Sequence, residues 1–183
     1  QDNDGINDDV DTDDDGINGL DADSDGNGLI EIRTLAILDS IRFQLDSAGL
    51  KLEKNGSLDT SGCPKKIVSG VYVQSCSGYE LMNDLDFDAN ANGVADEGDD
   101  YWNSASGWLP IAGYNNTTRA YDSFTGIFEG NGHTIHNLYI NRTDKGYVSL
   151  FGQVGSYSTI RNLNLNGSVT GGSTSAGLIG NAK

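Results

Sequence analysis

Aspartate residues at alternating positions are the part of this sequence with the clearest capacity for chemistry. The pattern Asp-x-Asp-Gly occurs three times near the start of the chain, with its glycine at Gly5, Gly16 and Gly26. Calcium takes six to eight hard oxygen ligands, which alternate carboxylates on a tightly turning loop supply. The glycine permits the turn after the third ligand. The segment therefore predicts calcium binding, with about two to four ions over the whole chain.

Three overlapping loops of this kind are predicted before residue 32. The best copy places three aspartates before Gly26 and closes with Glu31, one residue earlier than in a helix–loop–helix calcium loop. A second copy precedes Gly16, and a third surrounds Gly5. The expected ligands, in chain order, are Asp2, Asp4, Asp8, Asp11, Asp13, Asp15, Asp21, Asp23, Asp25 and Glu31.

A second acidic cluster matches the calcium-loop pattern more closely. Its side chains fall at loop positions 1, 3, 5, 9 and 12, with Gly93 at position 6. An aspartate replaces the usual glutamate at position 12, which should weaken the closing contact. The flanking sequences do not read as helices, so we expect a calcium loop inserted between strands over residues 88–99. The expected ligands are Asp88, Asn90, Asn92, Asp96 and Asp99.

The acidic residues are concentrated rather than spread over the chain. The net charge is −16, and the segments 1–31 and 84–100 contain no lysine or arginine. This distribution favours ligand clusters over a generally solvated acidic surface, although a solvated, disordered tail is the alternative for residues 1–31. The sequence has no basic patch to neutralise phosphates, so we expect no nucleic-acid partner.

The two cysteines, Cys63 and Cys76, flank a strand-like run. We predict a disulfide that closes this excursion and contributes roughly 3 kcal/mol by loop entropy. The alternative is a pair of unrelated buried thiols. A zinc site is not expected, because both histidines lie far along the chain. No apolar run approaches the ~20 residues of a membrane helix, so we expect no membrane insertion. The chain begins with Gln1 rather than Met, which we interpret as processing that removed an export signal.

One helix is predicted, over about residues 34–46, with Thr34 as its N-cap. A lone amphipathic helix before many strands suggests a cap over the end of a β structure. An ordinary helix packed on a sheet face is the alternative. The apolar stripe that defines the helix is Leu35, Leu38, Ile41, Phe43 and Leu45.

An internal repeat follows in the second half of the chain. Residues 135–141 (IHNLYIN) recur 25 residues later as 160–166 (IRNLNLN), and Leu-Phe-Gly at 150–152 recurs as Leu-Ile-Gly at 178–180, with Gly-Ile-Phe at 126–128 as a degenerate earlier copy. Coils of this length, with short strands and Gly/Asn turns, indicate a β-solenoid in which strands stack from coil to coil. Asn137 and Asn162 are then equivalent and either form an amide ladder or are solvated turn residues.

Two family resemblances follow from these motifs. The stretches DNDGINDDVD and DTDDDGINGLDAD resemble thrombospondin type 3 repeats. The stretches GYELMNDLDF, GWLPIAG, FTGIFEGNGHTIHNLYI, SLFGQV, TIRNLNLNGSVTG and AGLIGNA resemble the GLUG-repeat solenoids of bacterial adhesins and surface peptidases, with a departure at Ser149. These resemblances imply a secreted or cell-surface location, a mainly β, right-handed parallel β-helix, and no catalytic residues within the repeats.

Together these inferences predict an Asp-rich calcium-binding segment (1–28) and a β-solenoid domain (29–183) with a capping helix, a disulfide excursion (63–76) and the inserted loop. The expected function is that of a calcium-stabilised extracellular structural or adhesive module of a bacterial surface protein, with a cell-surface, matrix or carbohydrate partner. One alternative is a filament subunit that associates head-to-tail through solenoid ends. We do not expect an enzyme, because His133 and His136 lack a neighbouring acid pair.

A carbohydrate-binding or polysaccharide-active β-helix is the remaining alternative. Four aromatic residues near the second acidic loop could form a platform on which a sugar stacks. Aromatic residues in such a position also fill the core of a first coil, and the sequence leaves both interpretations open. The residues are Tyr101, Trp102, Trp108 and Tyr114.

Overall fold

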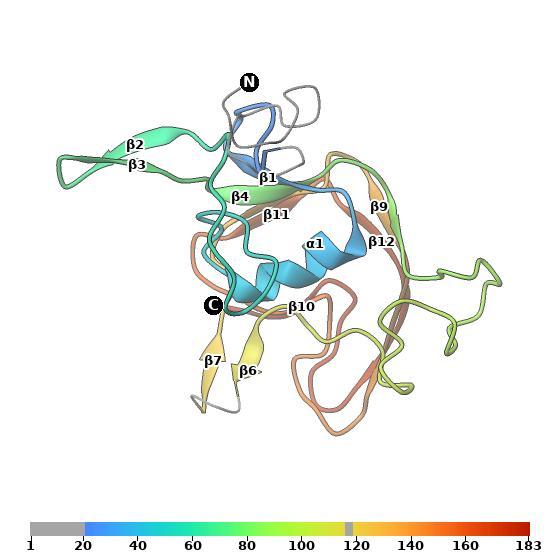
Figure 1. The fold of residues 1–183 in the computed structure, drawn as a ribbon. Coiled ribbons are helices and arrows are strands. Elements are labelled where there is room, and N and C mark those ends of the chain that lie inside the picture. Colours follow the sequence, from blue (N-terminus) through green and yellow to red (C-terminus); the bar gives the residue numbers. More distant parts are fainter. Residues whose placement is uncertain (1–20, 116–118) are drawn as a thin grey trace.

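The computed structural model describes residues 21–115 and 119–183, which form a mainly β structure (Figure 1). One short helix, α1 (Leu35–Ser40), continues as the 3-10 turn η1 (Ile41–Phe43). The strands are β1 (Leu29–Ile32), β2 (Lys65–Val68), β3 (Val71–Gln74), β4 (Gly78–Leu81), β5 (Leu85–Asp86), β6 (Gly113–Asn115), β7 (Ala120–Asp122), β8 (Ile127–Glu129), β9 (Thr134–Arg142), β10 (Phe151–Val154), β11 (Thr159–Arg161), β12 (Asn164–Gly171) and β13 (Ile179–Ala182).

Three parallel sheets make up the body of the molecule. Their strand orders are β1-β4-β8-β11, β5-β9-β12 and β10-β13, so neighbours in a sheet are distant in sequence. In the first sheet Gly78 pairs with Leu29 and with Ile127, each 49 residues away. Parallel neighbours require a long connection between them, and here the connections run through the other sheets and through excursions.

The register differs from the predicted 25-residue repeat. Ile135 pairs with Leu165, and Ile160 pairs with Phe128 in a different sheet. The register shifts by one residue between Leu165 and Gly167, so β9 carries an extra residue at this point. The expected equivalence of residues 135–141 with 160–166 was therefore wrong, as was the assignment of 126–128 to the Leu-Phe-Gly set. Two strands with the same apolar alternation accept several registers, and the bulge decides between them.

Asn137 and Asn162 accordingly form no amide ladder. The Asn137 main-chain N–H donates instead to the Oδ1 of Asn166, at 2.9 Å. Asn137 adopts φ = 56°, in the left-handed region that asparagine tolerates, and supplies the turn that the bulge requires. The pairing of Phe151 with Ile179, by contrast, agrees with the recurrence predicted for the Leu-Phe-Gly motif.

The core is a set of apolar rows that run across the parallel strands. Ile30, Tyr79 and Phe128 occupy equivalent positions on β1, β4 and β8, and all three are buried. Phe151 of β10 packs against Phe128 and Phe124, with ring centroids 5.2 and 5.1 Å apart. Stacked apolar side chains of this kind remove surface from water on successive strands, which holds the sheets together.

Helix α1 is shorter than predicted but begins where expected. The Ile37 N–H donates to the Thr34 Oγ1 at 3.2 Å, so the predicted N-cap is confirmed. The helix ends at Ser40, whose hydroxyl donates to the Ile37 carbonyl, and η1 replaces the last predicted turns. Its buried residues belong to the same core as the sheets, and Figure 1 shows it across the area that β4, β9 and β10 surround. In the described residues no helix is long and apolar enough to cross a membrane.

The predicted disulfide is confirmed between Cys63 and Cys76, whose Cα atoms lie 5.0 Å apart. It closes the antiparallel hairpin β2–β3, which turns at Ser69 and Gly70, both in the left-handed region. The hairpin extends away from the parallel sheets (Figure 1). Its apolar side chains are 41–75% exposed: Ile67, Val68, Val71, Tyr72 and Val73.

Candidate metal centres

The first acidic loop is organised by the side chain of Asp23. Its Oδ1 accepts from the Asn27 N–H (3.1 Å) and its Oδ2 accepts from the Gly28 N–H (2.8 Å). Asp25 Oδ1 also accepts from the Asn27 N–H (2.9 Å), and Asn27 Oδ1 accepts from the Leu29 N–H (2.8 Å). Three side chains at alternate positions therefore face inward on one tight loop.

The second acidic loop repeats these four hydrogen bonds. Asp88 accepts from the N–H groups of Asn92 (Oδ1, 3.1 Å) and Gly93 (Oδ2, 2.7 Å). Asn90 Oδ1 accepts from the Asn92 N–H (3.0 Å), and Asn92 Oδ1 accepts from the Val94 N–H (2.8 Å). The spacing between donors and acceptors is the same in both loops, although they lie about 65 residues apart.

This correspondence moves the register of the first loop. Position 1 is Asp23 rather than Asp21, position 5 is Asn27, and the glycine of position 6 is Gly28 rather than Gly26. Gly28 (φ = 91°) and Gly93 (φ = 77°) both adopt the left-handed conformation at this place. The predicted alignment around Gly26 began two residues too early and omitted Asn27, because a sequence of alternating aspartates and two glycines fits both registers.

The remaining residues of the first loop lie around it. Asp25 is exposed, whereas Glu31 is buried and accepts from the Ser24 hydroxyl while it pairs with Arg33. Asp21 is half-buried, and its Oδ1 is buried without a hydrogen-bond partner. The predicted ligands Asp2, Asp4, Asp8, Asp11, Asp13 and Asp15 lie outside the described residues.

The second loop is closed by Asp96 and Asp99. Asp96 accepts from the side-chain amides of Asn90 (Oδ1, 2.9 Å) and Asn92 (Oδ2, 2.7 Å), and the Gly98 N–H and the Asn92 amide lower the pKa of its carboxyl. Asp99 Oδ2 accepts from the Asp96 N–H at 2.9 Å, and its Oδ1 is buried without a partner. All five predicted side chains thus belong to one hydrogen-bonded loop.

The donor set of both loops fits a hard cation. The inward groups are carboxylate and amide oxygens, which calcium prefers, and each region contains one buried carboxylate oxygen without a partner. Within the described residues, no three acidic side chains of either loop bring oxygens within 4.8 Å of one another. The carboxylates are therefore more open than around a bound ion, where oxygens lie 2.3–2.6 Å from one centre.

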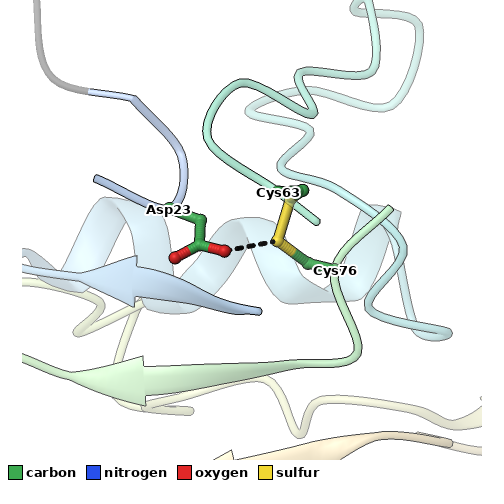
Figure 2. A group of neighbouring side chains, drawn as sticks. All are labelled: Asp23, Cys63 and Cys76. Atoms are coloured by element: carbon green, nitrogen blue, oxygen red, sulfur yellow. Dashed lines mark hydrogen bonds between the residues drawn. A yellow bond between two sulfur atoms is a disulfide. The ribbon is translucent and has the colours of Figure 1, made fainter. Parts of the chain in front are cut away.

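Asp23 also contacts the disulfide (Figure 2). It is fully buried, and its Oδ2 lies 3.4 Å from the Cys76 sulfur. Asp23, Cys63 and Cys76 are the one group in residues 21–115 and 119–183 whose acidic or sulfur ligand atoms cluster within 4.8 Å, but the disulfide leaves no thiolate to bind a metal. Burial raises the pKa of the Asp23 carboxyl. The hydrogen bond from the Gly28 N–H lowers this pKa, but burial has the larger effect.

The disulfide excursion supports the first loop through main-chain contacts as well. The Ala22 N–H donates to the Ser61 hydroxyl (2.9 Å), and the Asp23 N–H donates to the Ser61 carbonyl (3.2 Å). A Cβ at Gly62 would lie 1.8 Å from the Asp23 carbonyl oxygen, so the two segments approach as closely as glycine allows. The disulfide therefore fixes a segment on which the loop rests.

A row of glutamates on the parallel sheet was not predicted. Glu31, Glu80 and Glu129 pair in register on β1, β4 and β8, and they are only 4%, 5% and 6% exposed. We call these three residues the glutamate row. Their recurrent context, IEI, YEL and FEG, is visible in the sequence at a spacing of 49 residues, about twice the predicted repeat of 25.

Each carboxylate of the glutamate row has hydrogen-bond donors. The Oε1 of Glu80 accepts from the Asn27 amide and its Oε2 from the Asn131 amide, both at 2.7 Å. Glu129 accepts from the Asn131 N–H (2.9 Å) and from the Arg161 Nε (2.5 Å). Asn27 therefore connects the first acidic loop to the centre of the row.

Trp108 cannot belong to the predicted aromatic platform. Trp108 is completely buried and packs edge-on against Phe87 (5.3 Å) and Tyr101 (5.0 Å), so the alternative interpretation as core is confirmed for it. The Tyr101 hydroxyl donates to the Leu35 carbonyl at 3.2 Å. Trp102 stacks on Tyr139, and only Tyr114 of the four is among the exposed large side chains.

The two histidines do have an acidic neighbour in space. His133 Nδ1 lies 3.1 Å from Asp84 Oδ1, and His136 Nε2 lies 3.6 Å from Asp84 Oδ2. The Thr134 N–H and His133 lower the pKa of the Asp84 carboxyl. Asn166 contacts the other nitrogen of His136 at 3.0 Å. This exposed contact could not be predicted from the sequence, because Asp84 lies about 50 residues earlier in the chain.

Comparison with known proteins gives two partial matches. The chain is 40% identical over 95 residues (51% of this chain, 1% of the relative) to halomucin of Haloquadratum walsbyi. It is 37% identical over 89 residues (49% of this chain, 8% of the relative) to a Gly-rich membrane protein of Evansella cellulosilytica. The chain thus spans a small part of both relatives. No family model and no solved structure matches it.

Proposed function

We propose that this chain is a calcium-stabilised, non-catalytic structural or adhesive module of an extracellular surface protein. Its parallel sheets belong, in this proposal, to a right-handed parallel β-helix, the handedness usual for parallel crossovers. The names of the two relatives, a mucin and a membrane protein, support a cell-surface location, as does the disulfide, since disulfides persist in oxidising compartments.

The observation that carries the proposal is the identical hydrogen-bond pattern of the two acidic loops. Asp23 and Asp88 each accept hydrogen bonds from the N–H groups of the residues four and five positions later in the chain. Both loops also direct side-chain oxygens inward at alternate positions. Two segments far apart in the chain share these four contacts, and oxygen-only sets of this length suit calcium. The second ligand set is Asp88, Asn90, Asn92, Asp96 and Asp99, and the first is Asp23, Asp25, Asn27 and Glu31.

Calcium in these loops would act on stability rather than on chemistry. The first loop contacts both the disulfide excursion and the glutamate row, and the second leads into the segment of Tyr101 and Trp108. An ion bound only by the folded chain at 100 times its dissociation constant stabilises it by about 2.7 kcal/mol. For a chain of this size, that corresponds to a rise in Tm of roughly 5–10 °C.

The test is thermal unfolding of the full chain in millimolar calcium chloride and in excess EGTA. We expect a higher Tm in calcium and a smaller calcium-induced rise for both Asp23→Asn and Asp88→Asn. The control Glu53→Gln removes one exposed acid elsewhere and should keep the full rise. Because the readout is the increment caused by calcium, a general loss of stability in a variant does not imitate the expected result. Equal Tm values with and without calcium would contradict the proposal.

Head-to-tail self-association is a second candidate, favoured by the edges of the parallel sheets. In the described residues β11, β12 and β13 each pair on one side only, and apolar side chains beside these edges, such as Leu165 and Leu178, are partly exposed. Unpaired parallel edges accept further strands. Sedimentation velocity at two protein concentrations, with calcium and with EGTA, distinguishes the candidates. Large species would favour a filament, and a monomer throughout would contradict it.

A further inference from the structure

A pocket of about 430 Å³ lies apart from both acidic loops. Its wall combines the end of η1, the residues that lead into β6, and the connection that follows β9. The volume is within the range of small-molecule sites. Unlike the acidic loops, the pocket is lined by three basic side chains, Arg42, Arg142 and Lys145, and one acid, Asp122.

Arg142 supplies a partly buried positive charge to the wall of the pocket. Its guanidinium donates to two neutral main-chain oxygens, those of Trp108 (Nε, 3.0 Å) and Gly107 (Nη2, 3.0 Å). Burial and the nearby charge of Arg42 lower the pKa of Arg142, and the charge of Asp144 opposes them in part. A partly buried cation whose hydrogen bonds go to neutral carbonyl oxygens gains free energy from an anion in the pocket.

The other two bases are paired but lie beside it. Arg42 forms an ion pair with Asp39 and lies over the Trp108 ring, 5.1 Å from its centroid. Lys145 pairs with Asp144 at 2.9 Å, and both side chains are largely exposed. An exposed pair of this kind is worth little, so Lys145 can exchange its partner for a ligand at small cost.

Tyrosines form the rim of the pocket. The Tyr114 and Tyr147 rings both line it, and Tyr121 contacts each of them edge-on at 5.2 and 5.1 Å. Tyr114 is 54% exposed and Tyr121 is 45% exposed. Rings that hold one another in place offer flat faces with hydroxyl groups at little entropic cost, which suits a sugar ring.

We propose that this pocket binds an acidic saccharide, with a sugar carboxylate on Arg142 and Lys145 and the sugar ring against Tyr114 and Tyr147. The planar guanidinium matches a carboxylate in two hydrogen bonds. This site is separate from the predicted platform, of which it retains only Tyr114, and it does not depend on calcium binding.

The test is an NMR titration of the full ¹⁵N-labelled chain at 150 mM salt with trigalacturonate, and in parallel with neutral galactotriose. At this salt the repulsion between the ligand and the acidic chain is largely screened. We expect trigalacturonate to shift the amide signals around Tyr114, Arg142 and Tyr147, and galactotriose to bind at least tenfold more weakly. The tenfold factor corresponds to the loss of one hydrogen bond to a charged group.

Three variants and one matched control define the site. Arg142→Gln and Lys145→Gln should each weaken trigalacturonate binding about tenfold, and Tyr114→Ala should weaken both sugars. Lys145 and Tyr114 are exposed, so their variants keep the test valid if Arg142→Gln fails to fold. Lys54→Gln removes the same charge from an exposed position elsewhere and should leave binding unchanged.

Four results would overturn the proposal. One is the absence of binding by either sugar, and another is the appearance of shifts away from the pocket. The third is equal binding of the two sugars, since the carboxylate would then make no contribution. The fourth is a loss of affinity in Lys54→Gln as large as in Lys145→Gln, because such a loss would reflect the net charge of the chain rather than a site.

Discussion

Replacement of Glu129 by glutamine tests how the glutamate row is stabilised. Glu129 lies between Glu80 on one neighbouring strand and Arg161 on the other. At one strand spacing, about 4.8 Å, two unit charges interact by roughly 3–4 kcal/mol at an effective dielectric constant of 20. Arg161 contacts the Glu129 carboxylate directly, and its attraction opposes the repulsion from Glu80 on the neighbouring strand. The hydrogen bonds from Asn131 and Arg161 then decide whether Glu129 stabilises the fold relative to glutamine.

Those hydrogen bonds set the expected magnitude. A hydrogen bond to a charged group contributes about 1.5–3 kcal/mol, and glutamine keeps one acceptor oxygen of the two. We expect Glu129→Gln to lower the free energy of unfolding at pH 7 by about 2 kcal/mol, with a Tm lower by roughly 4–8 °C.

The pH dependence provides a second readout. Burial alone would raise the pKa of Glu129, but the Asn131 N–H and the Arg161 guanidinium outweigh it and hold this pKa below the ordinary value of a glutamate. A carboxyl with a depressed folded pKa stabilises the fold above its unfolded pKa, and this contribution is lost as the pH falls through the folded value. The difference between Glu129→Gln and the parent chain should therefore shrink below about pH 4.5.

Urea unfolding at pH 7 and pH 3 measures both effects, with Glu53→Gln as the exposed control. A variant as stable as the parent at pH 7, or more stable, would refute the reasoning. It would mean that repulsion within the glutamate row exceeds the hydrogen bonds and the Arg161 pair.

Three further predictions concern the disulfide, the bulge and the core. Replacement of Cys63 and its partner by serine should lower the free energy of unfolding by about 3 kcal/mol in urea, and an unchanged value would mean that packing alone orders the excursion. Gly167→Ala places a Cβ 2.1 Å from the Leu138 carbonyl at φ = 150°, so we expect a fall of more than about 2 kcal/mol, against about 1 kcal/mol for Gly132→Ala, which meets open space. Equal effects would contradict the close approach. Trp108→Ala should cost about 3–5 kcal/mol in thermal unfolding, whereas a loss below 1 kcal/mol would contradict its place in the core.

Local features were predictable where neighbouring residues determine them. Thr34 is an N-cap because its hydroxyl needs only the next turn of backbone, and Cys63 pairs with Cys76 because no other cysteine competes. The ligand positions of the second acidic loop could be numbered from Gly93, which occupies position 6 of the calcium-loop pattern. These inferences required no knowledge of what lies across the molecule.

Register and site composition were not predictable in the same way. Ile135 has equally apolar candidates at Ile160 and Leu165, and the bulge that selects Leu165 leaves no compositional trace. Asn27 was missed because Gly26 and Gly28 both satisfy the loop pattern. The pocket around Arg142 is assembled from three separated segments, whose proximity depends on that register.

The equal spacing of Gly78 from Leu29 and Ile127 has an evolutionary consequence. The first interval contains α1 and the β2–β3 hairpin, and the second contains the second acidic loop and the β6–β7 hairpin. The later intervals across β8–β11 and β10–β13 are shorter, 32 and 28 residues, yet the strands pair equally well. Insertions and deletions between strands therefore leave the strand pairing intact. Homologous chains should diverge in length within these intervals, while the paired positions keep their residue types.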